Sequence, residues 1–437
     1  MMLVLGLGLV STLLPWALGN RLGMLPLVSP LHLLALFCGM GFLAKTIGWI
    51  FDPTLAVHPR FVPSDAVHGG ALYLAGFVGA LCLGYALLAG GRPVAAVRPV
   101  LRLGRTSSRR LAAAALALLG LVLLVLAALR GAVDPLSFLQ DVSRAKQVRL
   151  NAEGIGSTFA GLKALLVLSK LAFVLLLAAA LGETGRRSTS LPALALLGAG
   201  LLVVAVASGD RFELIELGAY VVITIVITRG PPSRGMAGWL LAGAAVLVLF
   251  ADLMTRWRFG AGGGEGLVRQ ILGSTYFLDI NVASIAVDRI GAEDRLHGES
   301  YLWWSFGGVP RAIWFDKPAT DLGVWFKAEV MGLSGGGAIN VTGPGEAFAN
   351  FGWGGIFVGL ALGAGFRALE EILLAGSAAR RAGCLLYPVL FYPFLQSCLQ
   401  SSFSAALVTA LVQLPLCLLA LSFVLPQGRG WEVRHAA

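Results

Sequence analysis

Residues 298–352 read GESYLWWSFGGVPRAIWFDKPATDLGVWFKAEVMGLSGGGAINVTGPGEAFANFG and carry most of the polar chemistry of a largely apolar chain. This stretch is rich in Trp, Gly and Pro, and its polar side chains stand among apolar neighbours: Arg311, Lys317, Glu346 and Asn350. It is too polar to span a bilayer and too apolar for a freely solvated loop. We interpret it as a lid on the membrane surface, over a site in a bundle of helices.

The composition places the rest of the chain in a membrane. Hydrophobic residues make up 57% and charged residues 13%, with a mean hydropathy of +0.83, whereas soluble domains carry roughly 25% charged residues. Long apolar runs recur from end to end, and in hydrocarbon such runs satisfy their backbone groups as helices. The alternating segments of a membrane β-barrel do not occur in the sequence. The fold class that we predict is therefore an all-α, polytopic membrane protein.

The apolar runs give eleven predicted spans. They are 2–18, 31–51, 69–89, 111–129, 162–181, 191–207, 212–228, 236–251, 351–374, 385–399 and 405–423. They divide the chain into membrane helices 1–8 (1–251), a loop with interfacial helices (252–350), and helices 9–11 with a short tail (351–437). Within the loop, 267–290 has a helical apolar rhythm broken by charges, which favours an interfacial or re-entrant helix over a span.

Loop charges predict the orientation. The loop 90–110 carries six arginines and no acid, which is typical of a cytoplasmic loop. Alternation then places the C-terminal tail on the same side and 252–350 on the outer, periplasmic side. The net charge of +10 follows from such loops, and we infer no nucleic-acid partner. The partners expected from composition alone are membrane lipids.

The junction Ser208-Gly209-Asp210-Arg211 joins two apolar runs with almost no loop. Ionisable residues at such a place tend to face a bundle interior or a wet cavity. Arg211 either binds an anion at the mouth of a cavity, for which its planar fork is suited, or pairs with Glu213 or Glu216 to pin two helices.

A short basic segment lies in the outer region 130–158. Arg144 and Arg149 belong to it, and it is either a solvated surface helix or a contact for lipid phosphates or a lipid-linked diphosphate.

Two prolines stiffen the centre of the lid. Pro310-Arg311 and Lys317-Pro318 bracket Trp314, and the fixed φ of proline would present both cations in a defined geometry. The tryptophans of the lid form an interfacial belt or stack on sugar rings. Glu346 is either a general base or a negative charge at a helix N-terminus.

Signatures of soluble enzymes do not occur in the sequence: there is no P-loop, dinucleotide fingerprint or zinc spacing. The five cysteines lie in or beside apolar runs, and we interpret them as packing residues. A metal site is not predicted.

The segment SYLWW…VPRAIWFDKP, followed by GPGEAFANFGWGG at the start of a late span, resembles the Wzy-type O-antigen and oligosaccharide repeat-unit polymerases. The SGDR junction at 208–211 is similar to an element at a helix mouth in that family. The resemblance covers roughly residues 200–365, and the remainder agrees only in hydropathy.

The resemblance implies a metal-independent glycosyltransferase without a cofactor, in the bacterial inner membrane and facing the periplasm. It would transfer a growing glycan from undecaprenyl diphosphate to an incoming lipid-linked repeat unit, for O-antigen, capsule or exopolysaccharide, and its partners would include a chain-length regulator and a flippase. Arg211, Arg311 and Lys317 would hold the diphosphate. Glu346, or else Glu299 or Asp279, would deprotonate the acceptor hydroxyl. Rival interpretations are a ligase-like transferase, a polysaccharide transporter or flippase, and a structural assembly subunit.

Overall fold

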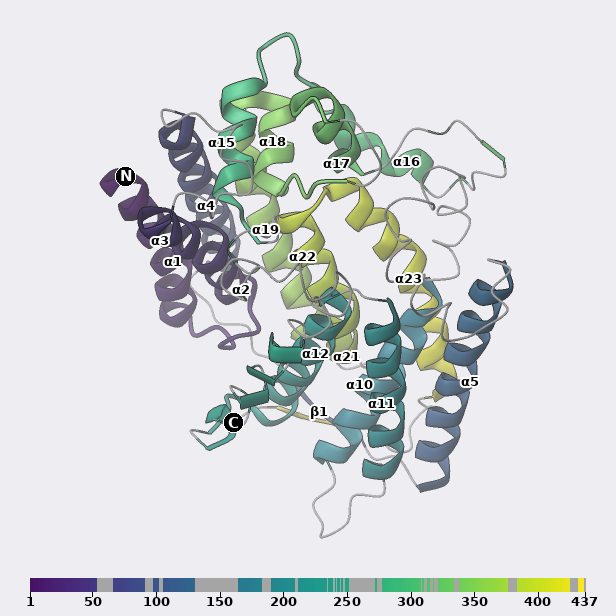
Figure 1. Ribbon diagram of the computed structural model, residues 1–437. Helices are drawn as coiled ribbons and strands as arrows, with labels where there is room; N and C mark the ends of the chain where they lie inside the picture. Colours follow the sequence, from purple (N-terminus) through teal and green to yellow (C-terminus); the bar gives the residue numbers. More distant parts are fainter. Residues whose placement is uncertain are drawn as a thin grey trace.

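The computed structural model is a bundle of helices with a polar cap at one end (Figure 1). It describes most of the chain, in these parts: 1–52, 66–90, 97–101, 105–129, 164–182, 190–208, 211–233, most of 235–250, 272, 277–307, 309, 313, 314, 317, 321–333, 338–375, 383–424 and 431–435. All statements below concern these residues.

Four helices are long and apolar enough to cross a membrane. They are α1 (Met2–Arg21), the continuous run Pro30–Phe51 (α2 Pro30–Cys38, a π-helical turn Gly39–Leu43, and α3 Ala44–Phe51), α4 (Ala66–Ala89) and α23 (Phe403–Val424). Their outward faces expose large apolar side chains. The prediction of a helical membrane protein is confirmed in this form.

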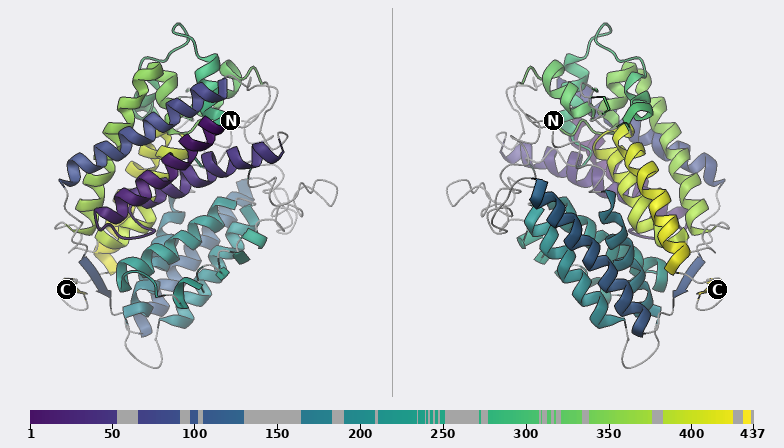
Figure 2. Two further views of the ribbon diagram at one scale, coloured as in Figure 1. Left: turned by 90° about the vertical axis from the view of Figure 1, so that its left-hand side faces the viewer. Right: turned by 90° about the vertical axis from the view of Figure 1, so that its right-hand side faces the viewer.

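A second group of helices packs side by side in the lower half of Figure 2, in blue and teal. It consists of α5 (Arg105–Leu129), α10 (Leu166–Gly182), α11 (Leu191–Ser208) and α12 (Arg211–Arg229). Their facing sides form an apolar core of Ala, Leu, Val and Phe. The expected span 236–251 lies only partly in the described residues, where helical pieces occur between 235 and 250.

The C-terminal part returns to the first group of helices. It contains α18 (Gly343–Phe351), a 3-10 turn (Gly352–Gly355), α19 (Ile356–Leu374), α21 (Gly383–Leu386), a π-helical turn (Tyr387–Phe391), α22 (Tyr392–Gln400) and α23. One short antiparallel pair, β1 (Val97–Leu101) with β2 (Trp431–His435), departs from the all-α expectation. The pair joins the loop and the tail that we assigned to the same side, and it lies away from the cap (Figure 1).

Helices α4 and α19 pack against each other through glycines. A Cβ added at Gly359 would lie 2.7 Å from the carbonyl oxygen of Phe77, and one at Gly84 or Gly363 would overlap the backbone of the facing helix. Small residues four apart allow helix backbones to approach this closely in membranes. This contact fixes the position of α19, and with it the position of α18 at its upper end.

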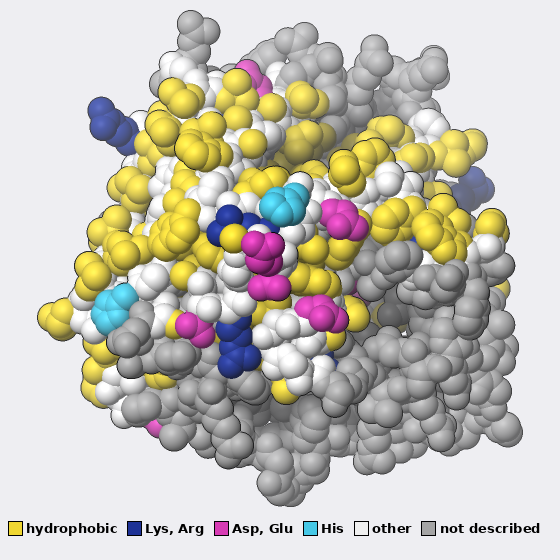
Figure 3. Space-filling model, turned by 90° about the horizontal axis from the view of Figure 1, so that it is seen from above, with side chains coloured by type: hydrophobic (Ala, Val, Ile, Leu, Met, Phe, Trp, Pro, Cys, Tyr) yellow, Lys and Arg dark blue, Asp and Glu magenta, His cyan; other side chains and the backbone are white. Residues whose placement is uncertain are grey.

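The cap is built from the helices that follow the second group: α15 (Ile280–Arg289), a 3-10 turn (Glu299–Leu302), α16 (Trp304–Gly307), α17 (Leu322–Trp325) with a π-helical turn (Phe326–Val330), and α18. Seen from above, charged side chains gather in the middle of this face, with apolar side chains around them (Figure 3).

Helix α15 is the C-terminal part of the expected helix 267–290, and most of 267–276 lies outside the described residues. Its side chains from Ile280 to Ala286 are buried. Its N-terminus is capped by Asp279, which accepts the N–H of Asn281 at 2.8 Å and pairs with Lys45 of α3 at 2.6 Å. The first two turns of the helix are therefore enclosed by the protein on every side, and its 10 residues are too few to span a bilayer.

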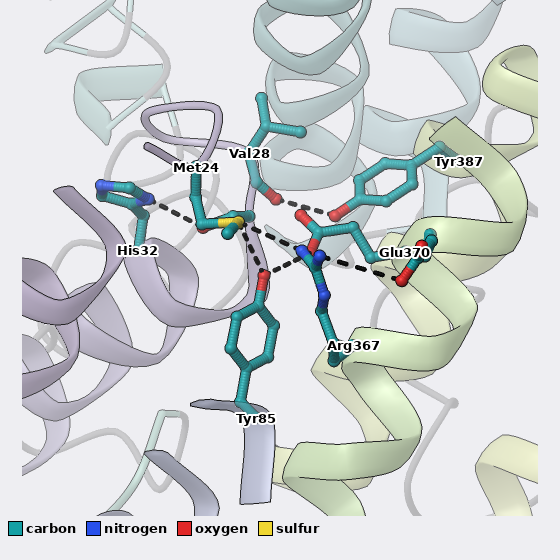
Figure 4. Close-up of polar contacts among 9 residues, drawn as sticks. Met24, Val28, His32, Tyr85, Arg367, Glu370 and Tyr387 are labelled. Carbon is teal, nitrogen blue, oxygen red and sulfur yellow. Dashed lines mark hydrogen bonds and ion pairs between the residues drawn. The ribbon is translucent and has the colours of Figure 1, made fainter. Parts of the chain in front are cut away.

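A buried polar cluster lies between α4, α19 and the connection from α1 to α2 (Figure 4). The Nη1 of Arg367 and the Oε2 of Glu370, both on α19, are 3.8 Å apart. The Tyr85 hydroxyl of α4 donates a hydrogen bond to the Glu370 carboxylate. The Tyr387 hydroxyl donates to the carbonyl of Val28 at 3.0 Å. These bonds join α4, α19, the turn before α22 and the connection between α1 and α2, and we assign them a structural role.

Candidate functional site

Glu346 is buried in the first turn of α18, inside the cap, with 1% of its surface exposed. The helix begins here because Pro344 occupies the first turn and the side chain of Thr342 accepts the N–H of Gly345 at 3.3 Å. The carboxylate therefore lies at a helix N-terminus, as one of the two interpretations of the sequence expected. The contacts of this carboxylate bear on the other interpretation, that Glu346 is a general base.

Two donors from different parts of the chain meet the Glu346 carboxylate. The Ser300 hydroxyl donates at 2.8 Å and the backbone N–H of Phe403, at the start of α23, donates at 2.7 Å. Burial raises the pKa of Glu346 to about 7, while these two hydrogen bonds lower it in part. A carboxyl group with such a pKa exchanges its proton near neutral pH, which is the property a general base needs.

Asn350 lies one turn further along α18 and completes the network. Its amide nitrogen donates to the Ser300 hydroxyl at 2.7 Å and to the Glu346 carbonyl at 2.8 Å, and its amide oxygen accepts the N–H of Gly298 at 2.9 Å. The Ser404 hydroxyl donates to the Ser300 carbonyl. The structure thus joins the two ends of the stretch 298–352 around a single carboxylate.

Tyr301 lies between this network and the surface. Its ring stacks on Phe351 with centroids 6.1 Å apart and contacts Phe403 edge-on at 5.6 Å. Burial, and then the nearby Glu346 charge, raise the pKa of the Tyr301 hydroxyl well above its usual value. Tyr301 also lines a shallow apolar groove of about 420 Å³ that runs along the start of α19, with Phe351, Gly354, Phe357, Val358 and Ala361.

The expected cation site lies largely outside the described residues. Arg311, Arg144 and Arg149 fall in parts that the structure does not describe. Arg211 is the first residue of α12, but its side chain is outside the description. The expectation that Arg211 and Arg311 meet at one cavity therefore stays a prediction.

Lys317 and Trp314 of the lid are described. The Lys317 ammonium donates to the carbonyls of Gly307 and Val309 at 2.9 and 2.8 Å, so it ties down the turn after α16. Trp314 is 39% exposed, and its ring lies 5.7 Å from that of Phe306. Both residues lie in the cap, and their binding to a diphosphate or a glycan stays a prediction.

The rival acids differ from Glu346 in their surroundings. Glu299 is exposed to solvent, and Asp279 is engaged by Lys45 and by the cap of α15. At the SGDR junction, Glu213 and Glu216 pair with Lys170 of α10 at 2.9 and 2.7 Å. Asp279 and Glu346 are both buried, but among the described residues only Asp279 has a cationic partner. Glu346 accepts from Ser300, the neighbour of the groove residue Tyr301.

The sequence analysis did not anticipate Ser300, Ser404 or the N–H of Phe403 as parts of this site. The available signal was the polar run Ser401-Ser402-Phe403-Ser404 at the head of an apolar span. Such a run marks a helix start, but it does not say which distant residue the start contacts.

Comparison of the chain with models of known protein families, with curated proteins and with solved structures finds no match.

Proposed function

We propose that the protein is a membrane glycosyltransferase that polymerises oligosaccharide repeat units carried on undecaprenyl diphosphate. In this proposal the chain crosses the bacterial inner membrane eleven times and its cap faces the periplasm. The observation that carries the proposal is the buried Glu346, which is held by Ser300 and lies one turn from Asn350. These residues come from the two segments that carry the resemblance to the polymerases.

The chemistry requires one base and one set of cations. The acceptor sugar hydroxyl attacks the anomeric carbon of the donor glycan, its proton passes to the Glu346 carboxylate, and the bond from that carbon to the diphosphate oxygen breaks. The diphosphate leaves with the electron pair. Arg211, Arg311 and Lys317 neutralise the charge that develops on it. No nucleotide takes part, since the donor is a lipid diphosphate.

Elongation by the purified protein tests this proposal. The wild-type protein, mixed in detergent with a lipid-linked repeat unit, should give a ladder of longer glycans. Glu346→Gln should abolish the ladder, because the amide cannot accept the proton, while the protein elutes from a sizing column as the wild type does. Glu371→Gln is the matched control, since that residue is 57% exposed on α19, away from the cap, and should elongate normally.

Two results would reject the proposal. A wild-type protein that elongates nothing would reject the transferase function, and a fully active Glu346→Gln variant would reject the assigned base. Supplying a lipid A acceptor in a parallel reaction separates a ligase from a polymerase. Transfer to that acceptor without elongation of repeat units would replace polymerisation by ligation.

A further inference from the structure

Arg295 stands on the cap with no partner among the residues that the structure describes. Among the described residues, no ion pair or hydrogen bond involves its guanidinium, and its Nε is buried without an acceptor. A buried donor without an acceptor costs free energy, and a guanidinium has five N–H donors that suit phosphate oxygens. Its position therefore indicates a ligand with oxygen atoms and negative charge.

The backbone beneath Arg295 fits closely around the guanidinium. A Cβ added at Gly352 would lie 2.7 Å from both Cζ and Nη2 of Arg295, and Gly352 has φ +58°. The N–H of Leu296 donates to the carbonyl of Ala349 at 2.9 Å. The segment that carries Arg295 is thus held against the end of α18, and its guanidinium lies over a glycine that no other residue could replace without displacing it.

The apolar groove begins next to this glycine. Phe351 and Gly354, on either side of Gly352 and Trp353, both line it, and it continues along α19 past Phe357 to Ala361. Phe357 is 74% exposed, on the outward face of a helix that we assign to the membrane. The groove thus has a cation at one end and apolar side chains along the remainder, which makes it complementary to a lipid with an anionic head.

We propose that Arg295 and this groove form a binding site for the lipid-linked substrate, which we call the seat. The guanidinium binds the phosphate of the lipid, and the groove holds its first isoprenyl units. The inference rests on the proposed function, and it deepens that function by naming a phosphate-binding residue beyond Arg211, Arg311 and Lys317. The seat places the phosphate beside Tyr301, and therefore beside the network around Glu346.

Acidic residues lie close to Arg295 in the sequence. Glu293, Asp294 and Glu299 are exposed nearby in the chain, and the Asp294 carboxylate accepts the N–H of Gly291 at 3.2 Å. They reduce the positive field over this part of the cap, so the anion is held by direct hydrogen bonds to the guanidinium. Lysine should replace Arg295 poorly, because an ammonium cannot make the paired bonds of a planar fork.

Lipid binding to the purified full-length protein in detergent tests the seat, with undecaprenyl diphosphate as the probe. Arg295→Ala should weaken binding about ten- to a hundredfold, the range expected for losing hydrogen bonds to a charged group. Ala361→Trp, which fills the groove, should weaken binding of the lipid but not of inorganic diphosphate. The matched control is Arg289→Ala, because Arg289 lies on the same cap and donates to the carbonyl of Val330; it should bind like the wild type.

The outcomes separate this inference from the proposed function. Unchanged binding by Arg295→Ala would overturn the seat, and equally strong binding of phosphatidylglycerol would overturn its assignment to a lipid-linked diphosphate. A wild-type protein that binds the probe through Arg295 but elongates no glycan would support the seat and reject the polymerase.

Discussion

The backbone N–H of Phe403 donates a 2.7 Å hydrogen bond to the Glu346 carboxylate, across 57 residues of sequence. Phe403 is the first residue of α23, and its N–H would otherwise be one of the unsatisfied donors at a helix N-terminus. Glu346 therefore fixes the start of a span that is long enough to cross the membrane, in addition to the role that we propose for it in catalysis. The titration of Glu346 should therefore change the stability of the protein.

We expect the stability of the protein to fall between pH 4.5 and pH 7. Burial raises the pKa of Glu346 from 4.5 to about 7, so in this window the unfolded chain has released a proton that the folded protein still holds. The Glu346 contribution to the free energy of unfolding then decreases as the pH rises, by about 3 kcal/mol in total, and levels off above the folded-state pKa. Thermal unfolding in detergent at several pH values measures this change.

Glu346→Gln provides the control for this prediction. The amide does not titrate, so the decrease between pH 4.5 and 7 should be smaller by the Glu346 contribution. An identical pH profile in the variant and the wild type would show that the carboxyl group titrates in the folded protein as it does in the unfolded chain.

The ion pair between Lys45 and Asp279 predicts strong coupling between α3 and α15. Their side chains are 3% and 0% exposed, and removing one member of a buried pair costs about 3–5 kcal/mol, because the other charge is left uncompensated. Lys45→Met should therefore destabilise the protein strongly. Lys45→Met combined with Asp279→Asn should be more stable than Lys45→Met alone, because asparagine keeps the cap of α15 without a charge.

Thermal unfolding of the four proteins in this double-mutant cycle gives the coupling energy. Additive losses would contradict the prediction, since two residues that do not interact lose stability independently.

The glycines of α19 offer a matched pair of substitutions. A Cβ at Gly363 would overlap the backbone of Leu81 in α4, whereas nothing lies within 4 Å of a Cβ at Gly365. Gly363→Leu should force the two helices apart and lower the stability by about 1–3 kcal/mol. Gly365→Leu should leave stability unchanged or raise it slightly, because leucine has the higher helix propensity. Equal melting temperatures for the two variants would contradict the close contact between α4 and α19.

The helical fold was predictable from the sequence because apolar runs of this length have few alternatives in a membrane. The ends of the helices were less predictable. The expected span 351–374 begins as an α-helix only at Ile356. The reason is that Gly352, with φ +58°, ends α18 and a 3-10 turn follows. One of the two interpretations of Glu346, a negative charge at a helix N-terminus, agrees with its position in the first turn of α18.

The long-range part of the site was not predictable. Glu213 and Glu216 pair with Lys170 of α10, a partner that the sequence did not indicate. Phe403 reaches Glu346, and Arg295 lies over Gly352, only because α4 and α19 fix the position of α18. Such contacts depend on the packing of whole helices, which local patterns of sequence do not specify.

The two arginines of the sequence prediction give the last test. Arg211→Ala and Arg311→Ala should each abolish polymer formation while the protein remains in the membrane, because the diphosphate would lose the cations that stabilise its departure. Lysine at either position should restore little activity, since it lacks the bidentate geometry. Glycan ladders from cells that carry each variant, with immunoblots of the membrane fraction, measure both effects. Normal long-chain polymer in both alanine variants would leave Arg295 and Lys317 as the cations of the site and remove Arg211 and Arg311 from it.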